Sequence, residues 1–498
     1  MIASSVKMKR QRIATSKVAI SIVIVIIVIV SAVGGTLLLI SKSTTSSTSS
    51  TTQSTSSTTS SSTISSILSS IESSSSTSIL SGTTSHSSST STTSTVSSTI
   101  VSSSVSTVAS TSSCTNAVQY STTIPASYQS MYTTLNGILN SFAQNLTTIQ
   151  AVPSHQTVYA TELLPADSNL GTQLLAPTQL QGVENFLNGI EKMGIDGVTI
   201  GVSYPILSPT YANYSQYLNF YEKVVQQVRD RGMKIDIESE TPLLVGYPGI
   251  DTGSLNYANL NYTTYVAQDR QMLQNVISYL HPDFLNIGTE TDTLQFILPY
   301  QQISTAQGWG TYIASLLDGL NKSTTKIAVG IGAWDPISYL YSTLNDSAVD
   351  IINIHVYPIY GDDLSVITQI GQLSKQYNKP IDIDEMWVHK SVMNEGQTLP
   401  GSFFTADANI SQRNMYSFWA PLDEKFLQVM NEYASVYNVA FMSPFQAPEF
   451  FAFVNYNQTT SNLGYNAAMQ AENQAASKNI QSGNISPLGC YYENLSTG

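Results

Sequence analysis

The sequence predicts one α/β domain, a (β/α)₈ barrel over residues 155–455. Eight apolar runs of strand length alternate there with segments of helical periodicity, which favours eight strand–helix units. Two of these runs end in a glutamate, Glu290 and Glu385. They are 95 residues apart, room for three units of about 32 residues each, close to the size of a βαβ repeat. We therefore expect both carboxyl groups at the same mouth of the barrel, since all strand ends face one side.

The strands follow from runs of Val, Ile and other apolar residues, and the helices from their spacing. The predicted strands are 157–163, 197–202, 234–238, 284–288, 327–331, 351–356, 381–384 and 439–443. Helical patterns lie between them, for example over 214–231, 265–280 and 413–437. Gly194, Gly232 and Asn378 stand where helices should stop before the next strand.

The N-terminal part predicts a membrane-anchored surface protein. Residues 18–40 are apolar for 23 positions, long enough to span a bilayer, and the basic segment 1–17 precedes them. The positive-inside rule then puts residues 1–17 in the cytoplasm and the rest outside the cell. We expect a single-pass protein of the cell membrane with an extracellular barrel, of a kind known from archaeal surface proteins. A cleaved signal peptide is the alternative.

The remaining segments lie on either side of the barrel. Residues 41–115 are almost entirely Ser and Thr, which cannot bury a core, and are predicted to form a disordered stalk. Apolar residues at helical spacing predict that 116–154 is a helical lead-in packed on the barrel. Residues 456–498 should form a last helix and a tail.

Charge excludes one class of partner. The formal net charge is −13, and five of the 20 basic residues lie before residue 18, so the remainder has 15 basic against 33 acidic residues, a balance of −18. This argues against nucleic acid as a partner, because phosphate binding requires basic patches. Only 11% of residues are charged, which hints at an acidic habitat.

Two cysteines, Cys114 and Cys490, bracket the part that should fold. Outside the cell we expect them to form a disulfide; the alternative is two unpaired thiols. No Cys/His cluster exists, so we predict no metal site, and the expected chemistry requires no cofactor. Nine Asn-x-Ser/Thr sequons predict surface glycosylation, at Asn145, Asn213, Asn261, Asn321, Asn345, Asn409, Asn457, Asn484 and Asn494.

The predicted strand ends collect acids, one imidazole and aromatic rings. They are Glu162, Ser203, Tyr204, Glu238, Glu240, Thr289, Glu290, Trp334, Asp335, His355, Tyr357, Glu385, Trp387, Gln446 and Glu449. Carboxyl groups can bind hydroxyls and flat rings can cover sugar C–H surfaces, so this set indicates a carbohydrate site. We expect seven residues to contact the sugar: His355, Tyr357, Thr289, Trp334, Trp387, Tyr204 and Glu238, with both tryptophans as stacking surfaces.

The stretch 155–455 resembles the retaining glycoside hydrolases of clan A, (β/α)₈ barrels that include cellulases, mannanases and galactanases. Ile287-Gly-Thr-Glu290 matches the acid/base motif at strand four, and Lys379-Pro-Ile-Asp-Ile-Asp-Glu385 matches the nucleophile motif at strand seven. His355-Val-Tyr357 matches the His-x-Tyr motif of strand six. The resemblance implies cleavage of a β-linked poly- or oligosaccharide by double displacement, with Glu290 protonated and Glu385 ionised. It also implies that Tyr357 binds the nucleophile and that His355 lines the site.

The sequence departs from that pattern in three ways. Thr289 stands where most of the clan has Asn, the usual Arg of strand two or three is absent, and strand eight lacks its Trp. Strand alternation also puts Asp382 and Asp384 on the face opposite Glu385, so one face must bury two carboxyl groups unless a bulge intervenes.

Four other functions stay open. A catalytically inactive glycosidase-like barrel that binds or displays glycans is the main alternative. A stem-anchored glycosyltransferase would use Asp382-Ile-Asp384 as a metal-binding D-x-D, but no nucleotide-binding half is evident. A serine hydrolase would need a complete G-x-S-x-G, which Gly201-Val-Ser203 does not continue. A tethered solute receptor should not have eight regular units.

Overall fold

The computed structural model of the 498-residue chain describes Cys114 and residues 117–151, 156–243, 256–358, 363–391, 410 and 412–497. The predicted basic segment 1–17, membrane anchor 18–40 and stalk 41–115 lie outside these residues, apart from Cys114. No helix within the described ranges is both long enough and apolar enough to cross a bilayer.

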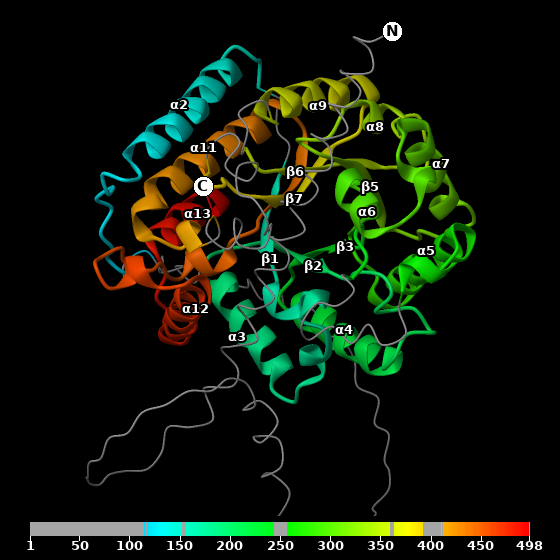
Figure 1. The fold of residues 1–498 in the computed structure, drawn as a ribbon, viewed down its shortest axis with the longest axis horizontal. Helices are drawn as coiled ribbons and strands as arrows, with labels where there is room; N and C mark the ends of the chain where they lie inside the picture. Colours follow the sequence, from blue (N-terminus) through cyan, green and yellow to red (C-terminus); the bar gives the residue numbers. More distant parts are fainter. Residues whose placement is uncertain are drawn as a thin grey trace, which may run out of the picture. The chain divides into compact units, whose positions relative to one another are not determined.

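Eight parallel strands form a closed barrel in which each strand pairs with the next and β8 pairs with β1 (Figure 1). They are β1 Val158–Glu162, β2 Gly197–Gly201, β3 Lys234–Glu238, β4 Phe284–Asn286, β5 Lys326–Gly332, β6 Ile351–Val356, β7 Ile381–Met386 and β8 Val439–Pro444. This confirms the predicted (β/α)₈ barrel, and every strand overlaps the run predicted for it. The runs are apolar because parallel barrel strands are covered on both faces.

Helices surround the barrel (Figure 1). The α-helices with both ends among the described residues are α2 Gln129–Leu146, α3 Gln179–Lys192, α4 Tyr214–Arg229, α5 Tyr262–Asn275, α6 Thr291–Ile297, α7 Ala306–Leu317, α8 Ser338–Tyr341, α9 Asp363–Tyr377, α11 Ala420–Val436, α12 Tyr465–Ser482 and α13 Pro487–Thr497. Short turns of 3₁₀ helix are η2 Leu164–Ala166, η3 Ser168–Leu175, η4 Tyr257–Asn259, η6 Gln301–Ile303, η8 Ser417–Trp419, η9 Ala447–Phe450 and η10 Thr460–Asn462, and the π-helical turn η5 Val276–Leu280 extends α5.

The predicted helix stops have the expected backbone. Gly194 and Gly232, which follow α3 and α4, have φ of 66° and 74°, and Asn378, directly after α9, has φ of 51°. Glycine and asparagine tolerate this left-handed conformation better than other residues, so the chain can leave each helix and enter the next strand.

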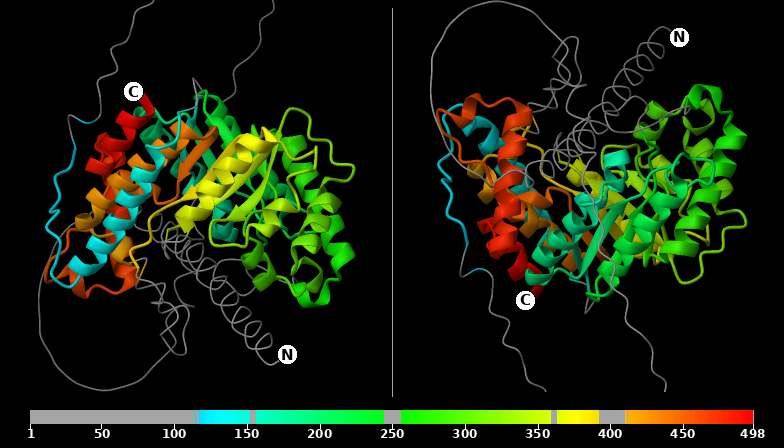
Figure 2. Two further views of the ribbon diagram at one scale, coloured as in Figure 1. Left: turned by 90° about the horizontal axis from the view of Figure 1, so that it is seen from above. Right: turned by 90° about the horizontal axis from the view of Figure 1, so that it is seen from below.

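The helix predicted within the lead-in 116–154 is α2, and it packs against α11, beside which it runs in Figure 2. Its buried residues are Leu135, Leu139, Phe142 and Leu146, three or four apart, which is one face of a helix. Phe142 stacks on Tyr433 of α11, with 6.4 Å between ring centroids. This contact attaches the lead-in helix to the barrel.

A disulfide joins Cys114 to Cys490 in α13, with a Cα–Cα distance of 5.1 Å. The backbone N–H of Val118 also donates to the carbonyl of Ile485, at 3.0 Å. The start of the described region is therefore attached to the C-terminal helix by a covalent bond and to the residues just before that helix by a backbone hydrogen bond.

The barrel interior holds aromatic and acidic side chains. Phe284 of β4 and Phe441 of β8 contact each other inside, with ring centroids 5.4 Å apart. Asp236 of β3 pairs in register with Phe284, Asp382 of β7 pairs with Phe441, and both aspartates are fully buried. The strand ends beyond them carry the site.

A bulge in β7 explains how Asp384 and Glu385, although adjacent, both face inward. Asn353 of β6 pairs with Asp382, and His355 pairs with Glu385, so β7 has one more residue than β6 between these two pairs. Both carboxyl groups reach His355 as a result. This resolves the conflict that strict strand alternation predicts.

Candidate active site

Glu290 and Glu385 come together at a histidine. Glu290 precedes α6, Glu385 lies in β7, and His355 lies in β6 between them. The Nδ1 atom of His355 is 3.1 Å from Oε1 of Glu290 and 3.4 Å from Oε2 of Glu385. The structure therefore brings together the two predicted catalytic residues and the predicted His355.

These contacts limit the spacing of the two carboxyl groups. Because both oxygens contact one nitrogen, they cannot be further apart than the sum of the two distances, about 6.5 Å. Retaining glycosidases have carboxyl groups about 5–5.5 Å apart, and inverting ones about 6.5–9.5 Å. The largest carboxyl spacing that these contacts allow in this chain therefore equals the smallest spacing found in inverting enzymes.

Tyr357 and Trp334 stand beside this pair. The hydroxyl of Tyr357 donates a hydrogen bond of 2.7 Å to Oε2 of Glu385. Trp334 lies 6.0 Å from the Tyr357 ring between centroids, and its Nε1 donates to Asp292 at 3.1 Å. Trp334 is half-buried, so part of its ring remains available for contact.

Carboxyl groups from three strands meet at Glu385. Glu162 of β1, Glu238 of β3 and Glu385 each offer one oxygen within 4.8 Å of the others. Glu240, just beyond β3, accepts a hydrogen bond of 2.8 Å from the backbone N–H of Glu290. The predicted rim residues Glu162, Glu238 and Glu240 therefore belong to the same site.

Thr289 is turned into the barrel. Its Oγ1 lies 2.9 Å from Oδ1 of Asn286 and 2.6 Å from Oδ1 of Asn353, and the side chain is fully buried. A hydroxyl has one proton, so it donates to one of these oxygens at a time. Thr289 thus links the end of β4 to β6, and its hydroxyl is occupied by these two amide oxygens.

Three fully buried aspartates lie below the mouth. Asp236, Asp382 and Asp384 each place an oxygen within 4.8 Å of the other two. Asp384 is hydrogen-bonded to Asn286 at 2.7 Å and contacts Nε2 of His355 at 3.1 Å. No described donor reaches the Asp236 carboxyl, which interacts with Asp382 instead. A hydrogen bond between these two acids requires a proton on one of them.

The electrostatics of the site favour bound protons. Burial raises the pKa of Glu385 to about 8, although His355 and the Tyr357 hydrogen bond act in the opposite direction. Burial alone would lower the pKa of His355, but Glu385, Asp384 and Glu240 raise it well above its usual value. The protonated form is thus favoured for both the His355 imidazole and the Glu385 carboxyl. Further positive charge close to Glu385 would favour its ionised form.

Two predicted sugar contacts are placed elsewhere. Trp387 is fully buried, packs on Phe450 and has Lys390 Nζ 5.3 Å from its ring centroid, so it exposes no stacking surface. Tyr204 is also buried, and its hydroxyl donates to Gln268 of α5 at 2.6 Å. Neither side chain therefore has an exposed face: Trp387 lies against Phe450 of η9 and Tyr204 against α5. Contact of either residue with a sugar stays a prediction.

A second buried charge cluster lies outside the mouth. Glu449, which the sequence placed at the rim, interacts with the charges of Lys390, Asp423 and Glu472, and burial raises its pKa well above the usual value. Lys390 and Asp423 form an ion pair with no exposed surface. No sequence signal linked these distant residues.

Asn286 and Asn353 were also missed. Asn353 is two residues before His355 in β6, so strand alternation puts both on the inner face and could have indicated it. Asn286 is buried and four residues before Glu290. Only the contacts with Asp384 and Thr289 reveal its position.

The acidic groups have ligand types that a metal ion accepts. Four groups of three residues place their potential ligand atoms within 4.8 Å of one another, including Asp236, Asp382 and Asp384. Carboxylate oxygens are ligands for hard cations. The expectation of a site without metal or cofactor therefore stays a prediction.

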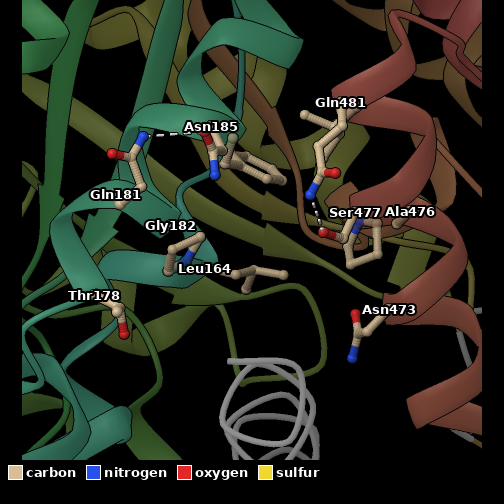
Figure 3. Close-up of a pocket in the computed structure, with 13 residues that line it drawn as sticks. Leu164, Thr178, Gln181, Gly182, Asn185, Asn473, Ala476, Ser477 and Gln481 are labelled. Carbon is tan, nitrogen blue, oxygen red and sulfur yellow. Dashed lines mark hydrogen bonds between the residues drawn. The ribbon is translucent and has the colours of Figure 1, made fainter. Parts of the chain in front are cut away.

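A separate pocket of about 270 Å³ lies between α3 and α12 (Figure 3). Leu164, Phe186 and Ile480 are among its apolar lining residues, and Gln181 and Asn185 contribute amides. None of its lining residues is charged. It therefore offers no acid or base, and the chemistry of the protein is assigned to the barrel mouth.

The sequons within the described residues lie at the surface. Seven asparagines are exposed: Asn145, Asn213, Asn261, Asn321, Asn345, Asn457 and Asn494. Asn484 is half-buried, and Asn409 lies outside the described residues. Glycosylation at these positions stays a prediction.

Comparisons with known proteins give distant structural similarity only. No protein-family model matches the chain, and no curated protein matches it. A GH5_18 protein of Bifidobacterium longum, in complex with Manβ1-4GlcNAc, is 13% identical over 69% of this chain and 78% of its own, with a TM-score of 0.44. Cel5A of Thermotoga maritima in complex with mannotriose is 14% identical over 63% and 97%, with a TM-score of 0.36. A GH113 β-1,4-mannanase is 13% identical over 63% and 95%, with a TM-score of 0.37. The barrel assignment rests on this chain's own strand order.

Proposed function

We propose that the protein is a glycoside hydrolase that cleaves a β-linked oligo- or polysaccharide with retention of configuration. Glu290 is the acid/base and Glu385 the nucleophile. The observation that carries this proposal is their shared contact with Nδ1 of His355, which limits the carboxyl spacing to about 6.5 Å. Tyr357, hydrogen-bonded to Glu385, fixes the orientation of the nucleophile.

The mechanism follows from this geometry. Protonated Glu290 gives its proton to the leaving oxygen while ionised Glu385 attacks the anomeric carbon, which forms a glycosyl-enzyme. Glu290, now ionised, removes a proton from water, which displaces Glu385 and releases the sugar. His355 contacts both carboxyl groups and stabilises the negative charge that moves from one to the other.

The test uses the purified full-length chain and the Glu385→Gln variant. Glutamine keeps the shape but is not a nucleophile, so kcat on aryl β-glycosides should fall at least about 10³-fold. Glu222→Gln, which changes an exposed glutamate of α4, is the matched control. NMR of the first product should give the β-anomer. Equal activity of the Glu385→Gln variant, or an α-anomeric first product, contradicts the proposal.

A glycan-binding barrel without catalysis is the second candidate. It is favoured by Thr289, which stands in the place of the usual Asn and whose hydroxyl is bound to Asn286 and Asn353. Glycan binding by the wild type without turnover of any β-glycoside would favour this candidate.

The same proposal puts the barrel outside the cell, held by an uncleaved anchor at residues 18–40. The support is the basic segment before this apolar run and the Cys114–Cys490 disulfide, a bond typical of oxidising compartments. Added protease should digest the barrel on intact cells while the N-terminal segment remains in the membrane. Protection of the barrel in intact cells contradicts this location.

A further inference from the structure

The mouth of the barrel carries far more negative than positive charge, and carboxyl groups gather around the nucleophile Glu385. Glu162 on β1 and Glu238 on β3 flank the nucleophile Glu385, with one oxygen of each within 4.8 Å of the others. Oε1 of Glu162 has no hydrogen-bond partner, although the side chain is only 3% exposed. A buried, unpaired carboxyl oxygen is costly unless a proton or a cation reaches it.

The groups facing this cluster do not supply that cation. From β3 comes Glu240, from the end of β4 comes Glu290, and from β7 comes Asp384. From β6 come the neutral Tyr357 and His355, whose imidazole already contacts Glu290, Glu385 and Asp384. One imidazolium therefore serves several carboxyl groups. Glu238 lies within 4.8 Å of it, but His355 forms its ion pairs with Glu290, Glu385 and Asp384 and not with Glu238 or Glu162.

Thr289, the neutral residue next to the acid/base Glu290, does not supply a hydrogen-bonding group for the sugar. Thr289 directs its hydroxyl to Asn286 and Asn353 inside the barrel, so it is not available to a substituent of the sugar. In retaining glycosidases the substituent at C2 of the reacting sugar lies next to the nucleophile. Here Glu162 and Glu238 each have a carboxyl oxygen within 4.8 Å of one of Glu385, so a substituent next to the nucleophile would meet these two groups.

We propose that the reacting sugar is a 2-amino-2-deoxy sugar whose ammonium group binds among Glu162, Glu238 and Glu385. The inference rests on the proposed glycosidase function and names its substrate class. An ammonium has three donors, one for each of the three carboxyl groups. It also brings positive charge to the nucleophile, which favours the ionised Glu385 that the reaction requires.

The competing possibility is a neutral sugar. Glu162 and Glu238 would then be protonated and would bind hydroxyl groups as neutral acids. The two possibilities differ in the preferred substituent at C2, so substrates that differ only at this atom separate them.

The test compares three 4-nitrophenyl β-glycosides that carry an ammonium, an acetamido or a hydroxyl group at C2, in both gluco and manno configuration, with the full-length chain. The ammonium substrate should have a kcat/KM at least about tenfold above the hydroxyl substrate, as a charge-assisted hydrogen bond predicts. Glu162→Gln and Glu238→Gln should each reduce this ratio about tenfold or more, and the exposed control Glu222→Gln should not change it. A ratio of one or below in the wild type, with turnover of the hydroxyl substrate, overturns the inference and leaves the proposed function intact.

If none of the glycosides is hydrolysed, the proposed function fails and binding decides the inference. Calorimetry should then give a tighter Kd for β-1,4-linked glucosamine tetramer than for cellotetraose by about tenfold or more, and Glu238→Gln should remove the difference. Equal affinities, or no binding of the glucosamine tetramer, overturn the inference.

Discussion

Tyr357 donates a hydrogen bond of 2.7 Å to Oε2 of Glu385, and this bond joins the ends of β6 and β7 at the reacting carboxyl. Burial raises the pKa of Glu385 to about 8, and the Tyr357 hydrogen bond acts in the opposite direction because it stabilises the ionised form. The tyrosine is therefore a positioning residue that also controls the charge of the nucleophile.

Replacing Tyr357 by Phe should shift the acidic limb of the kcat/KM profile to higher pH, by about one unit, since the pKa of Glu385 rises further. At a pH below that limb, kcat/KM should fall about tenfold. The control is Tyr341→Phe, because Tyr341 is 49% exposed and lies in α8. An unmoved acidic limb in Tyr357→Phe means that the hydrogen bond does not control Glu385.

Replacing Glu290 by Ala should affect substrates according to their leaving groups. A natural oligosaccharide needs a proton on its leaving oxygen, so kcat should fall about 10²–10⁴-fold. An activated aryl glycoside leaves without that proton and should lose much less in its first step. Azide should partly restore turnover, because it enters the vacated space and attacks the glycosyl-enzyme to give a β-glycosyl azide. Equal losses for both leaving groups would count against Glu290 as the acid.

The two tryptophans should respond differently to replacement by Ala. Trp334 is half-buried beside Tyr357, so its loss should raise KM more than it lowers kcat. Trp387 is fully buried against Phe450, so its loss should leave a cavity and reduce the free energy of unfolding by about 3–5 kcal/mol. Kinetics and denaturant unfolding of both variants measure this contrast. A stable Trp387→Ala variant with a raised KM would restore the exposed role predicted from sequence.

The barrel could be read from sequence because its signals are local. Each strand is a short apolar run, and Gly194 and Gly232 mark helix ends through a backbone conformation that other residues avoid. Glu290 and Glu385 could be predicted to meet because the ends of all strands in such a barrel share one mouth.

The missed features depend on geometry that the local pattern does not encode. The extra residue in β7 turns both Asp384 and Glu385 inward, which strict alternation forbids. Trp387 was expected in the cleft as a residue at the end of strand seven, but it lies just beyond the last residue of β7, where strand alternation no longer fixes its direction, and it packs on Phe450. The partners of Thr289 come from β4 and β6, and only the closed barrel brings them within reach.

The buried acids make a further prediction about pH and stability. Burial raises the pKa of Asp269 and Asp292 to about 7 and that of Glu472 to about 8, against about 4 in an unfolded chain. At these acids the folded state therefore binds more protons than the unfolded state between about pH 4 and 8, so they make stability fall as pH rises through this window. His389, whose pKa burial lowers to about 3, acts in the opposite direction below about pH 6.5, but it is one group against several. Thermal unfolding midpoints should be highest near pH 4 and decrease toward pH 8. A midpoint that increases over this range contradicts the prediction.

Asp236 gives this prediction a residue-level test. Its carboxyl is fully buried, has no described donor and interacts with Asp382, and burial and that neighbour raise its pKa well above the usual value. In Asp236→Asn the amide donates to Asp382 without needing a proton, so the variant should unfold at a higher temperature than the wild type at pH 8. Near pH 4, where the wild-type acid is already protonated, the two should differ little. Asp230→Asn, at an exposed position after α4, should reproduce the wild-type pH dependence. A parallel loss of stability at both pH values would mean that Asp236 is needed ionised, as a cation-bound or ion-paired carboxylate would be.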